Sequence, residues 1–204
     1  MSLDLLFEQL KHPNPNLREQ AMVDISEQRD ENTIPKLMSI LDNADVTYRR
    51  AAVKALGVIG VDAIPAIVND LLHSENVTVR SSCAKALAQI SVNYPDIEFP
   101  DAGLQGLKVA INDANPVVYI ASVMALGTMK KSGFEILSDA LQNTENPAVA
   151  VAIVNALADL KDERSMQVLQ QVSEDDSVDS YVKESAISAL SRLDMVMNFQ
   201  RNQK

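Results

Sequence analysis

A ten-residue string that occurs six times limits what this chain can fold into more than any other feature. The string runs bulky apolar, polar or basic, two variable residues, small, two variable residues, Ala, Leu, small. Its copies span 17–26, 48–57, 79–88, 118–127, 149–158 and 182–191. The Leu, replaced by Ile25 in the first copy, recurs at steps of 31, 31, 39, 31 and 33 residues. A period of about 20 to 50 residues is typical of a solenoid, whose units bury their apolar faces only by stacking on neighbours.

Each string follows a second amphipathic stretch. In the second repeat Ile34, Leu37, Ile40 and Leu41 have the spacing of one buried helix stripe. The linkers between the two stretches are rich in Asn, Asp, Ser and Pro, which favour the start of a helix. Each repeat is therefore predicted to be a helical hairpin, and the fold class is all-α, a right-handed α-solenoid of about six hairpins.

The regular spacing of the repeats predicts a single domain over residues 1–204. The repeats are expected at about 2–29, 30–60, 61–90, 102–130, 131–160 and 161–194. An irregular insertion, 91–101, accounts for the 39-residue step and contains Tyr94 and Phe99. Loops that leave a regular scaffold often bind partners, although a plain surface excursion explains the insertion as well. The segment 195–204 is expected to form a polar C-terminal cap.

Composition restricts the class of partner and the compartment. With 18 basic and 28 acidic residues the net charge is −10, which argues against nucleic acid and favours a basic or mixed protein surface. The single cysteine, Cys83, excludes an internal disulfide and a site with several thiolates in this chain. No apolar run has the length of a transmembrane segment, so a cytoplasmic location is expected.

No stretch has the pattern of a catalytic or metal-binding motif, so no catalytic residue and no metal site are predicted. His12 and His73 follow the first helices of repeats that are not adjacent, so they are expected to lie too far apart to share a metal. Cys83 stands at the small position of its string, where a buried structural thiol is expected.

The second position of the string is basic in four copies, at Arg18, Arg49, Arg80 and Lys183. These side chains could satisfy acidic or carbonyl groups of neighbouring hairpins. They could also form a row on the concave face that mixes cations with aromatic rings, as protein-binding hot spots do. The candidate residues for binding a partner or a bilin are Tyr48, Arg49, Arg50, Arg80, Tyr119 and Tyr94.

The segments ADVTYRRAAVKALG and ENVTVRSSCAKALA fit the pattern D-x-x-V-R-x-x-A-x-x-A-L-G of HEAT repeats. With the runs SSCAKALAQISVNYP and NPVVYIASVMALG, the chain resembles the phycobilisome-lyase HEAT-like repeat family of cyanobacteria, which holds the E/F-type bilin lyase subunits. Within it, the chain is similar over essentially all of its length to the small partner proteins of phycoerythrin lyases.

The resemblance implies a chaperone-like partner of a bilin lyase. Such a protein would bind and stabilise a phycobiliprotein subunit, phycoerythrin α or β, while a companion E/F-type lyase attaches phycoerythrobilin to it. No cofactor would be bound permanently, and phycoerythrobilin would be held at most transiently. Two alternatives stay open: a catalytic subunit of the lyase or isomerase, with the bilin held by Arg49, Arg80 and Tyr119, and a HEAT-repeat adaptor in phycobilisome disassembly.

Overall fold

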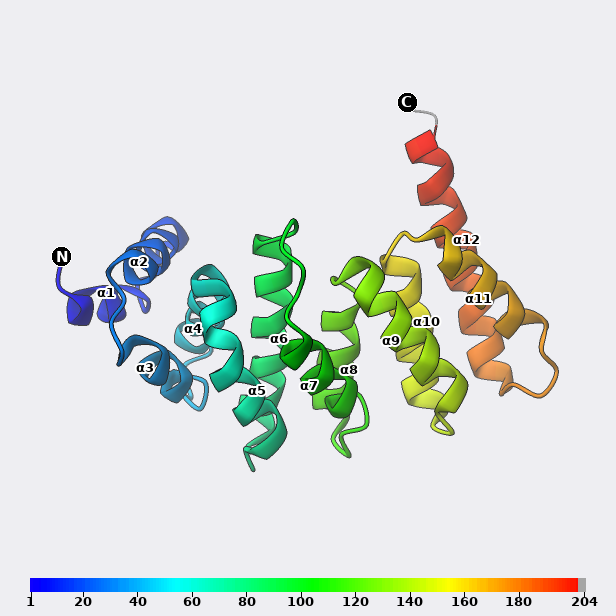
Figure 1. Cartoon of the computed structure of the whole chain (residues 1–204), viewed down its shortest axis with the longest axis horizontal. Coiled ribbons are helices and arrows are strands. Elements are labelled where there is room, and N and C mark those ends of the chain that lie inside the picture. Colours follow the sequence, from blue (N-terminus) through cyan, green and yellow to red (C-terminus); the bar gives the residue numbers. More distant parts are fainter. Residues whose placement is uncertain (202–204) are drawn as a thin grey trace. The chain divides into compact units, whose positions relative to one another are not determined.

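The predicted all-α architecture is confirmed. A computed structural model describes residues 1–201, with side chains through 199, and this part of the chain contains helices and no strand. The helices are α1 (Leu3–Gln9), α2 (Pro15–Gln28), α3 (Thr33–Ile40), α4 (Val46–Ile59), η1 (Gly60–Ala63), α5 (Ile64–His73), α6 (Val77–Asn93), α7 (Asp101–Ala110), α8 (Pro116–Leu126), α9 (Lys130–Asn143), α10 (Pro147–Asp159), α11 (Glu163–Glu174) and α12 (Ser180–Arg201). They form successive hairpins (Figure 1).

In each hairpin an odd-numbered α-helix comes first and an even-numbered α-helix, which holds the repeated string, comes second. The chain divides into two compact units, Met1–Ala121 and Ser122–Lys204, and the division falls within α8. Each unit is described by itself below. The repeat boundaries predicted for a single domain stay a prediction.

Side chains of Asn and Asp start the second helices, as the linker composition predicts. Each of these residues accepts a hydrogen bond from a backbone N–H of the first helical turn, which has no acceptor within the helix. The capping residues are Asn14, Asp45, Asn76, Asn115, Asn146 and Asp179. Because each cap follows its linker directly, the linker sequence sets where the second helix begins.

The fifth position of the string, which is small in every copy except the fifth, forms the centre of the core. Ala21, Ala52, Cys83, Ser122, Ile153 and Ala186 occupy this position and have no exposed surface. The Leu four residues later is also fully buried in most copies, for example Leu56 and Leu87. Burying one such Leu contributes about 1.5 to 3 kcal/mol, so the repeated pattern accounts for much of the stability.

The turn after α4 lies three residues beyond the end of the repeated string. Gly57, which follows an Ala-Leu pair, would suit a tight turn, but α4 continues through it to Ile59. A Cβ atom at Gly57 would lie 2.2 Å from Cγ of Gln89, so this glycine makes room for α6. The turn is made by Gly60, whose φ of 82° is in the left-handed region that favours glycine.

The insertion packs back onto the repeats. Its link between helices runs from Tyr94 to Pro100, because 91–93 still belong to α6 and Asp101 starts α7. The hydroxyl of Tyr94 donates a hydrogen bond to the backbone oxygen of Val58. The ring of Tyr94 lies over Gly60, where an added Cβ would be 2.8 Å from Cε2. Tyr94 therefore fastens the link to the end of α4.

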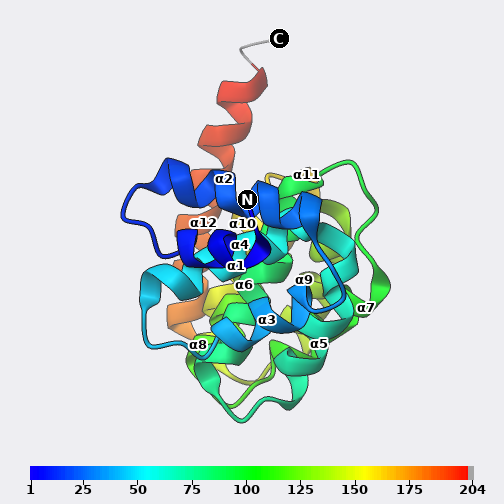
Figure 2. The ribbon, with the colours of Figure 1, turned by 90° about the vertical axis from the view of Figure 1, so that its left-hand side faces the viewer.

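The segment expected to be a polar cap is helical where the structure describes it. It continues α12, and both views show the end of α12 projecting past α11 (Figures 1 and 2). Met195 and Phe199 are 67% and 65% exposed, so this end of the helix is apolar as well as polar. Residues 202–204 of the predicted cap lie outside the described residues.

One helical stretch, Val46–His73, has the length and the hydropathy of a membrane span. It consists of α4, η1 and α5, which meet at the turn around Gly60, and 56% of its most apolar window is already buried in the protein. Packing between hairpins therefore explains its apolar character, as expected for core helices.

Candidate partner-binding surface

We call the second position of each string the slot position. It lies next to the linker of its own hairpin. In the first unit Arg18 donates through Nη1 to the backbone oxygens of His12 and Pro13, at 2.6 and 2.9 Å. Arg49 donates in the same way to the backbone oxygen of Asn43. Both side chains reach the backbone oxygen of the residue six positions earlier, and Arg18 also reaches the one five positions earlier. They therefore satisfy carbonyl groups, but these belong to the linker of their own hairpin and not to a neighbouring hairpin as predicted.

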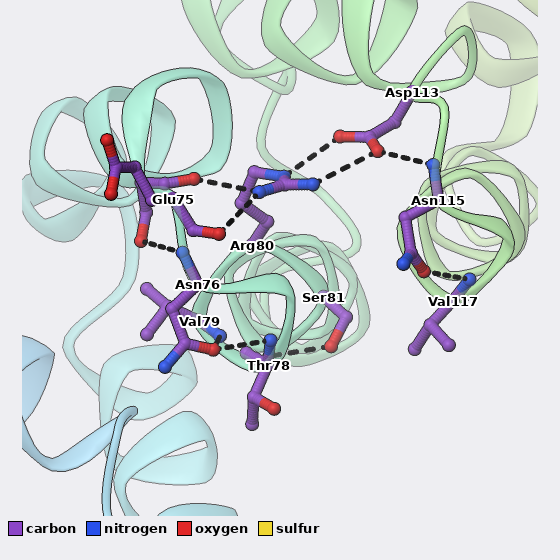
Figure 3. Close-up of polar contacts among 10 residues, drawn as sticks. Glu75, Asn76, Thr78, Val79, Arg80, Ser81, Asp113, Asn115 and Val117 are labelled. Carbon is purple, nitrogen blue, oxygen red and sulfur yellow. Dashed lines mark hydrogen bonds and ion pairs between the residues drawn. The ribbon is translucent and has the colours of Figure 1, made fainter.

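Arg80 does more than its counterparts because it also joins two repeats. Its Nη1 donates to the backbone oxygens of Ser74 and Glu75, at 2.9 and 3.2 Å. Its Nε and Nη2 donate to Oδ2 and Oδ1 of Asp113 in the next linker, at 2.9 and 3.2 Å (Figure 3). The side chains of this pair are only 16% and 15% exposed, so its charges are largely withdrawn from water.

The environment of Asp113 has two opposing effects on the pKa of its carboxyl group. Burial raises the pKa of this carboxyl, but the hydrogen bonds from the Arg80 guanidinium and from the backbone N–H of Asn115 outweigh burial and lower its pKa overall. The carboxylate therefore stays charged and holds Arg80 in place. Arg80 and Asp113 are structural residues that connect the third and fourth repeats.

Little of the predicted row of cations and rings is free on the surface. Tyr48 and Tyr119 are each only 8% exposed, and Tyr48 lies under the ammonium group of Lys11, 4.8 Å from its ring centre. The guanidinium groups of Arg49 and Arg80 are occupied by their linkers. As binding residues all six candidates, including Tyr94, stay a prediction, but the geometry directs attention to Arg50, which is exposed.

Arg50 lies at the third position of its string, next to the slot position. It lines a groove of about 290 Å³ between α2 and α4, with Pro15, Arg18, Glu19, Met22, Thr47, Ala51 and Lys54. No described residue forms a hydrogen bond or an ion pair with Arg50. The positive charge at this groove is therefore available to a partner.

Two lysines extend this charge, and sequence reasoning missed both. Lys54 and Lys85 occupy the seventh position of neighbouring strings, on α4 and α6, and both are exposed. Lys54 has only a distant contact with Glu19, at 3.6 Å. Positions three and seven of one helix share a face, and this spacing is the signal that could have found Lys54 beside Arg50. Lys85 takes the same position as Lys54 in the next string. We call Arg50, Lys54 and Lys85 the cationic row.

A larger groove in the second unit surrounds the slot position of the fifth repeat. It has a volume of about 530 Å³, and Ala150 occupies its slot position. It is lined by Leu141, Gln142, Thr144, Glu145, Asn146, Pro147, Ala150, Val168, Gln171, Val172, Asp175, Ser177, Val178, Asp179 and Val182. We call it the slot groove. The sequence shows that Ala150 interrupts the series of long side chains at the slot position, but a cavity does not follow from the sequence alone.

The cysteine and the histidine considered for chemistry in the sequence, Cys83 and His12, have structural roles. Cys83 is buried, as predicted, and desolvation raises the pKa of its thiol far above the ordinary value, so the reactive thiolate is disfavoured. His12 accepts a hydrogen bond through Nδ1 from the backbone N–H of Asn14. Within residues 1–201, no group of three or more His, Cys, Asp or Glu side chains is arranged to hold a metal ion.

The succession of hairpins, each with a first and a second helix, defines a HEAT-repeat protein. The family description for HEAT repeats matches residues 34–97 and 104–191, leaving out the end of the insertion. A designed armadillo repeat protein, solved in complex with the peptide (KR)4, has a similar fold, with a TM-score of 0.51 and 19% identity over 95% of this chain and 100% of that chain. This likeness supports the solenoid fold.

Two relatives place the chain more closely. It is 53% identical to the uncharacterized phycocyanin operon protein Z of Pseudanabaena tenuis (strain PCC 7409), over 99% of this chain and 100% of the relative. It is 33% identical to the bilin biosynthesis protein CpeZ of Synechococcus sp. (strain WH8020), over 84% of this chain and 95% of the relative. The chain belongs to the family of HEAT-repeat proteins that includes these two relatives, and the family resemblance seen in its sequence is confirmed.

Proposed function

We propose that this protein is a chaperone-like partner in bilin attachment, which binds a phycobiliprotein subunit while a companion E/F-type lyase attaches the chromophore. The observation that carries the proposal is family membership, since one relative is named a bilin biosynthesis protein and the other a phycocyanin operon protein. The predicted client is a phycoerythrin subunit. The name of the first relative makes a phycocyanin subunit the natural comparison.

The proposal assigns the contact to the second helices of the first unit. They carry the cationic row, and Arg50 has no partner among the described residues. On a chain with a net charge of −10, an exposed cluster of cations selects the acidic part of a client and orients its approach. Met22 and Ala51 also line the groove beside Arg50, but both are almost completely buried, so the charged side chains are the ones within reach of a client.

Phycoerythrobilin would enter this role as a substrate held for a short time. A guanidinium group binds a carboxylate with two parallel hydrogen bonds, so Arg50 could hold a bilin carboxylate next to the client. The single thiol is buried and its thiolate is disfavoured, so the thioether would form on the client's cysteine and not on Cys83. We keep the cytoplasm as the proposed location.

The test is co-expression with a phycoerythrin β subunit and phycoerythrobilin, with and without the companion lyase. We expect this protein to raise the soluble yield of the subunit, and covalent bilin to form only when the lyase is present. The same experiment with a phycocyanin subunit decides which client is preferred. A subunit that neither binds this protein nor gains solubility from it would contradict the proposal.

A matched pair of charge reversals tests the surface. Arg50→Glu is expected to weaken binding of the subunit about tenfold, or about 1.4 kcal/mol, because it places a negative charge in the cationic row. Lys131→Glu makes the same charge change at an exposed position of α9 in the second unit and is expected to leave binding unchanged. Equal losses in both variants would mean that only net charge matters.

The two alternatives predict different results. A catalytic subunit would attach bilin to the client without the companion lyase. An adaptor in phycobilisome disassembly would bind assembled phycobilisomes in preference to the free subunit. Each outcome would replace the chaperone-like role with the corresponding one.

A further inference from the structure

The slot groove exists because one repeat lacks the side chain that fills the equivalent space elsewhere. The slot position holds Arg18, Arg49, Arg80, Tyr119, Ala150 and Lys183 in successive repeats. Ala150 has a methyl group where the others have a long or aromatic side chain. The 530 Å³ groove opens beside Ala150. The third repeat therefore shows which kind of side chain this scaffold position accommodates.

The acceptors that Arg80 uses have counterparts around Ala150. Arg80 donates to the backbone oxygens of the residues six and five positions earlier. Counting back from Ala150 gives Thr144 and Glu145, and both line the slot groove. No described residue donates a hydrogen bond to their backbone oxygens. Two carbonyl acceptors thus lie where a guanidinium would find them.

The far side of the slot groove supplies negative charge, as Asp113 does for Arg80. Asp175 and Asp179, in the next linker, line the groove, and Glu145 adds a third carboxylate. Oδ1 of Asp175 accepts hydrogen bonds from the backbone N–H and the hydroxyl of Ser177, and Oδ1 of Asp179 accepts from the N–H of Tyr181. In both residues Oδ2 has no described donor.

The remaining lining suits an aliphatic stem. Val168, Val172, Val178 and Leu141 line the groove together with the polar groups. A side chain that combines a methylene stem with a planar cation would cover this apolar wall and reach the acceptors beyond it. Arginine has both parts, and its five donors match a mixture of carbonyl and carboxylate oxygens better than the single ammonium of lysine.

We propose that the slot groove receives an arginine side chain from a different protein, in the way that Arg80 fills the equivalent space in its own repeat. No basic residue lines the groove. A second copy of this chain carries the same net charge of −10, which opposes self-association, so a partner with an exposed arginine is the better occupant. The inference does not depend on a role in bilin attachment.

The test is a titration of the full-length, isotope-labelled protein with N-acetyl-L-arginine amide, followed by NMR through backbone amide shifts. We expect saturable shifts at Asn146 and Ser177. N-acetyl-L-lysine amide is expected to bind at least fivefold more weakly. The variant Ala150→Arg, which fills the groove from within, should remove the shifts, whereas Ala148→Arg should keep them, because Ala148 is exposed on the same helix and does not line the groove.

A gentler variant protects the test from a folding defect. Glu145→Gln removes one carboxylate from an exposed residue and is expected to weaken arginine binding several-fold. The proposal is overturned if arginine amide gives no saturable shifts, if lysine amide binds equally well, or if both Ala150→Arg and Glu145→Gln bind as the unmodified protein does. Sedimentation showing a dimer that Ala150→Arg abolishes would identify a second copy as the occupant and would also overturn it.

Discussion

The third and fifth repeats follow one plan and differ at the slot position. In both, an asparagine caps the second helix and the linker residues stand at the same distance from the slot. In the third repeat Arg80 fills the space above the linker and reaches Asp113 in the next repeat. In the fifth repeat Ala150 leaves the space open.

The difference teaches that a single position can serve either the fold or a partner on the same scaffold. The acceptors of the linker are backbone oxygens, which every repeat supplies whatever its sequence. A long cation at the slot uses them internally, and a small residue leaves them exposed beside a groove. Replacing a long cation at the slot position by a small residue should therefore lower the stability and open a groove for a partner, and the reverse replacement should do the opposite. The following substitutions test this.

The largest effect is expected from Arg80→Ala, which makes the third repeat resemble the fifth. The substitution removes the bonds to the linker and leaves the carboxylate of Asp113 partly buried without its cation. Breaking such a pair from one side costs about 3 kcal/mol of unfolding free energy. Urea denaturation followed by circular dichroism measures the loss.

Arg49→Ala is the control for that experiment. Arg49 donates to one backbone oxygen and forms no ion pair among the described residues, so its removal should cost less than about 1 kcal/mol. If the two variants lose the same stability, the bridge to Asp113 contributes nothing beyond the linker bonds, and the contrast between the repeats would be weaker than the structure indicates.

Acid should reduce the difference between the unmodified protein and Arg80→Ala. The pKa of Asp113 is lowered in the folded state, so its contribution is present above the unfolded value of about 3.9 and is lost as pH falls through the folded value. We expect the stability gap to shrink as the pH falls from about 5 to about 2.

The same urea experiment, repeated across this pH range, measures the gap. Asp113→Asn removes the titrating group, so a double variant with Arg80→Ala should show no extra pH dependence at this site. A gap that stays constant down to about pH 2 would show that the linker carbonyls, and not the carboxylate, hold Arg80.

The sequence predicts the scaffold well because the scaffold is periodic. The small position of the string, occupied by Ala52 and Cys83 in the second and third repeats, is fully buried, and Asn or Asp caps the second helices. These features depend on residues close together in the chain. The turn at Gly60 is not evident from the sequence, because Gly57 suits a turn equally well, and only the close approach of Gln89 to Gly57 distinguishes the two glycines.

The candidate surface was harder to predict because exposure depends on the neighbouring repeats. Tyr48 and Arg50 are two residues apart, yet one is buried and the other exposed, since they lie on different sides of α4. The string marks Tyr48 as bulky and apolar, which points to burial. The groove beside Ala150 lies where other repeats have a long side chain, and its lining comes from two linkers and from α9, α10, α11 and α12. Composition therefore gives no direct signal for it.

A gain in stability, smaller than the loss in Arg80→Ala, is expected from Ala150→Arg, which makes the fifth repeat resemble the third. The new guanidinium would find the backbone oxygens of Thr144 and Glu145 and the carboxylates of the next linker. Because those groups are hydrated in the open groove, the net gain should be about 1 kcal/mol, less than Arg80→Ala loses. Urea denaturation measures it, and Ala148→Arg, which adds the same charge outside the groove, should be neutral. A loss of stability in Ala150→Arg alone would show that the groove cannot accommodate a guanidinium, and the fifth repeat would then differ from the third in shape as well as in its slot residue.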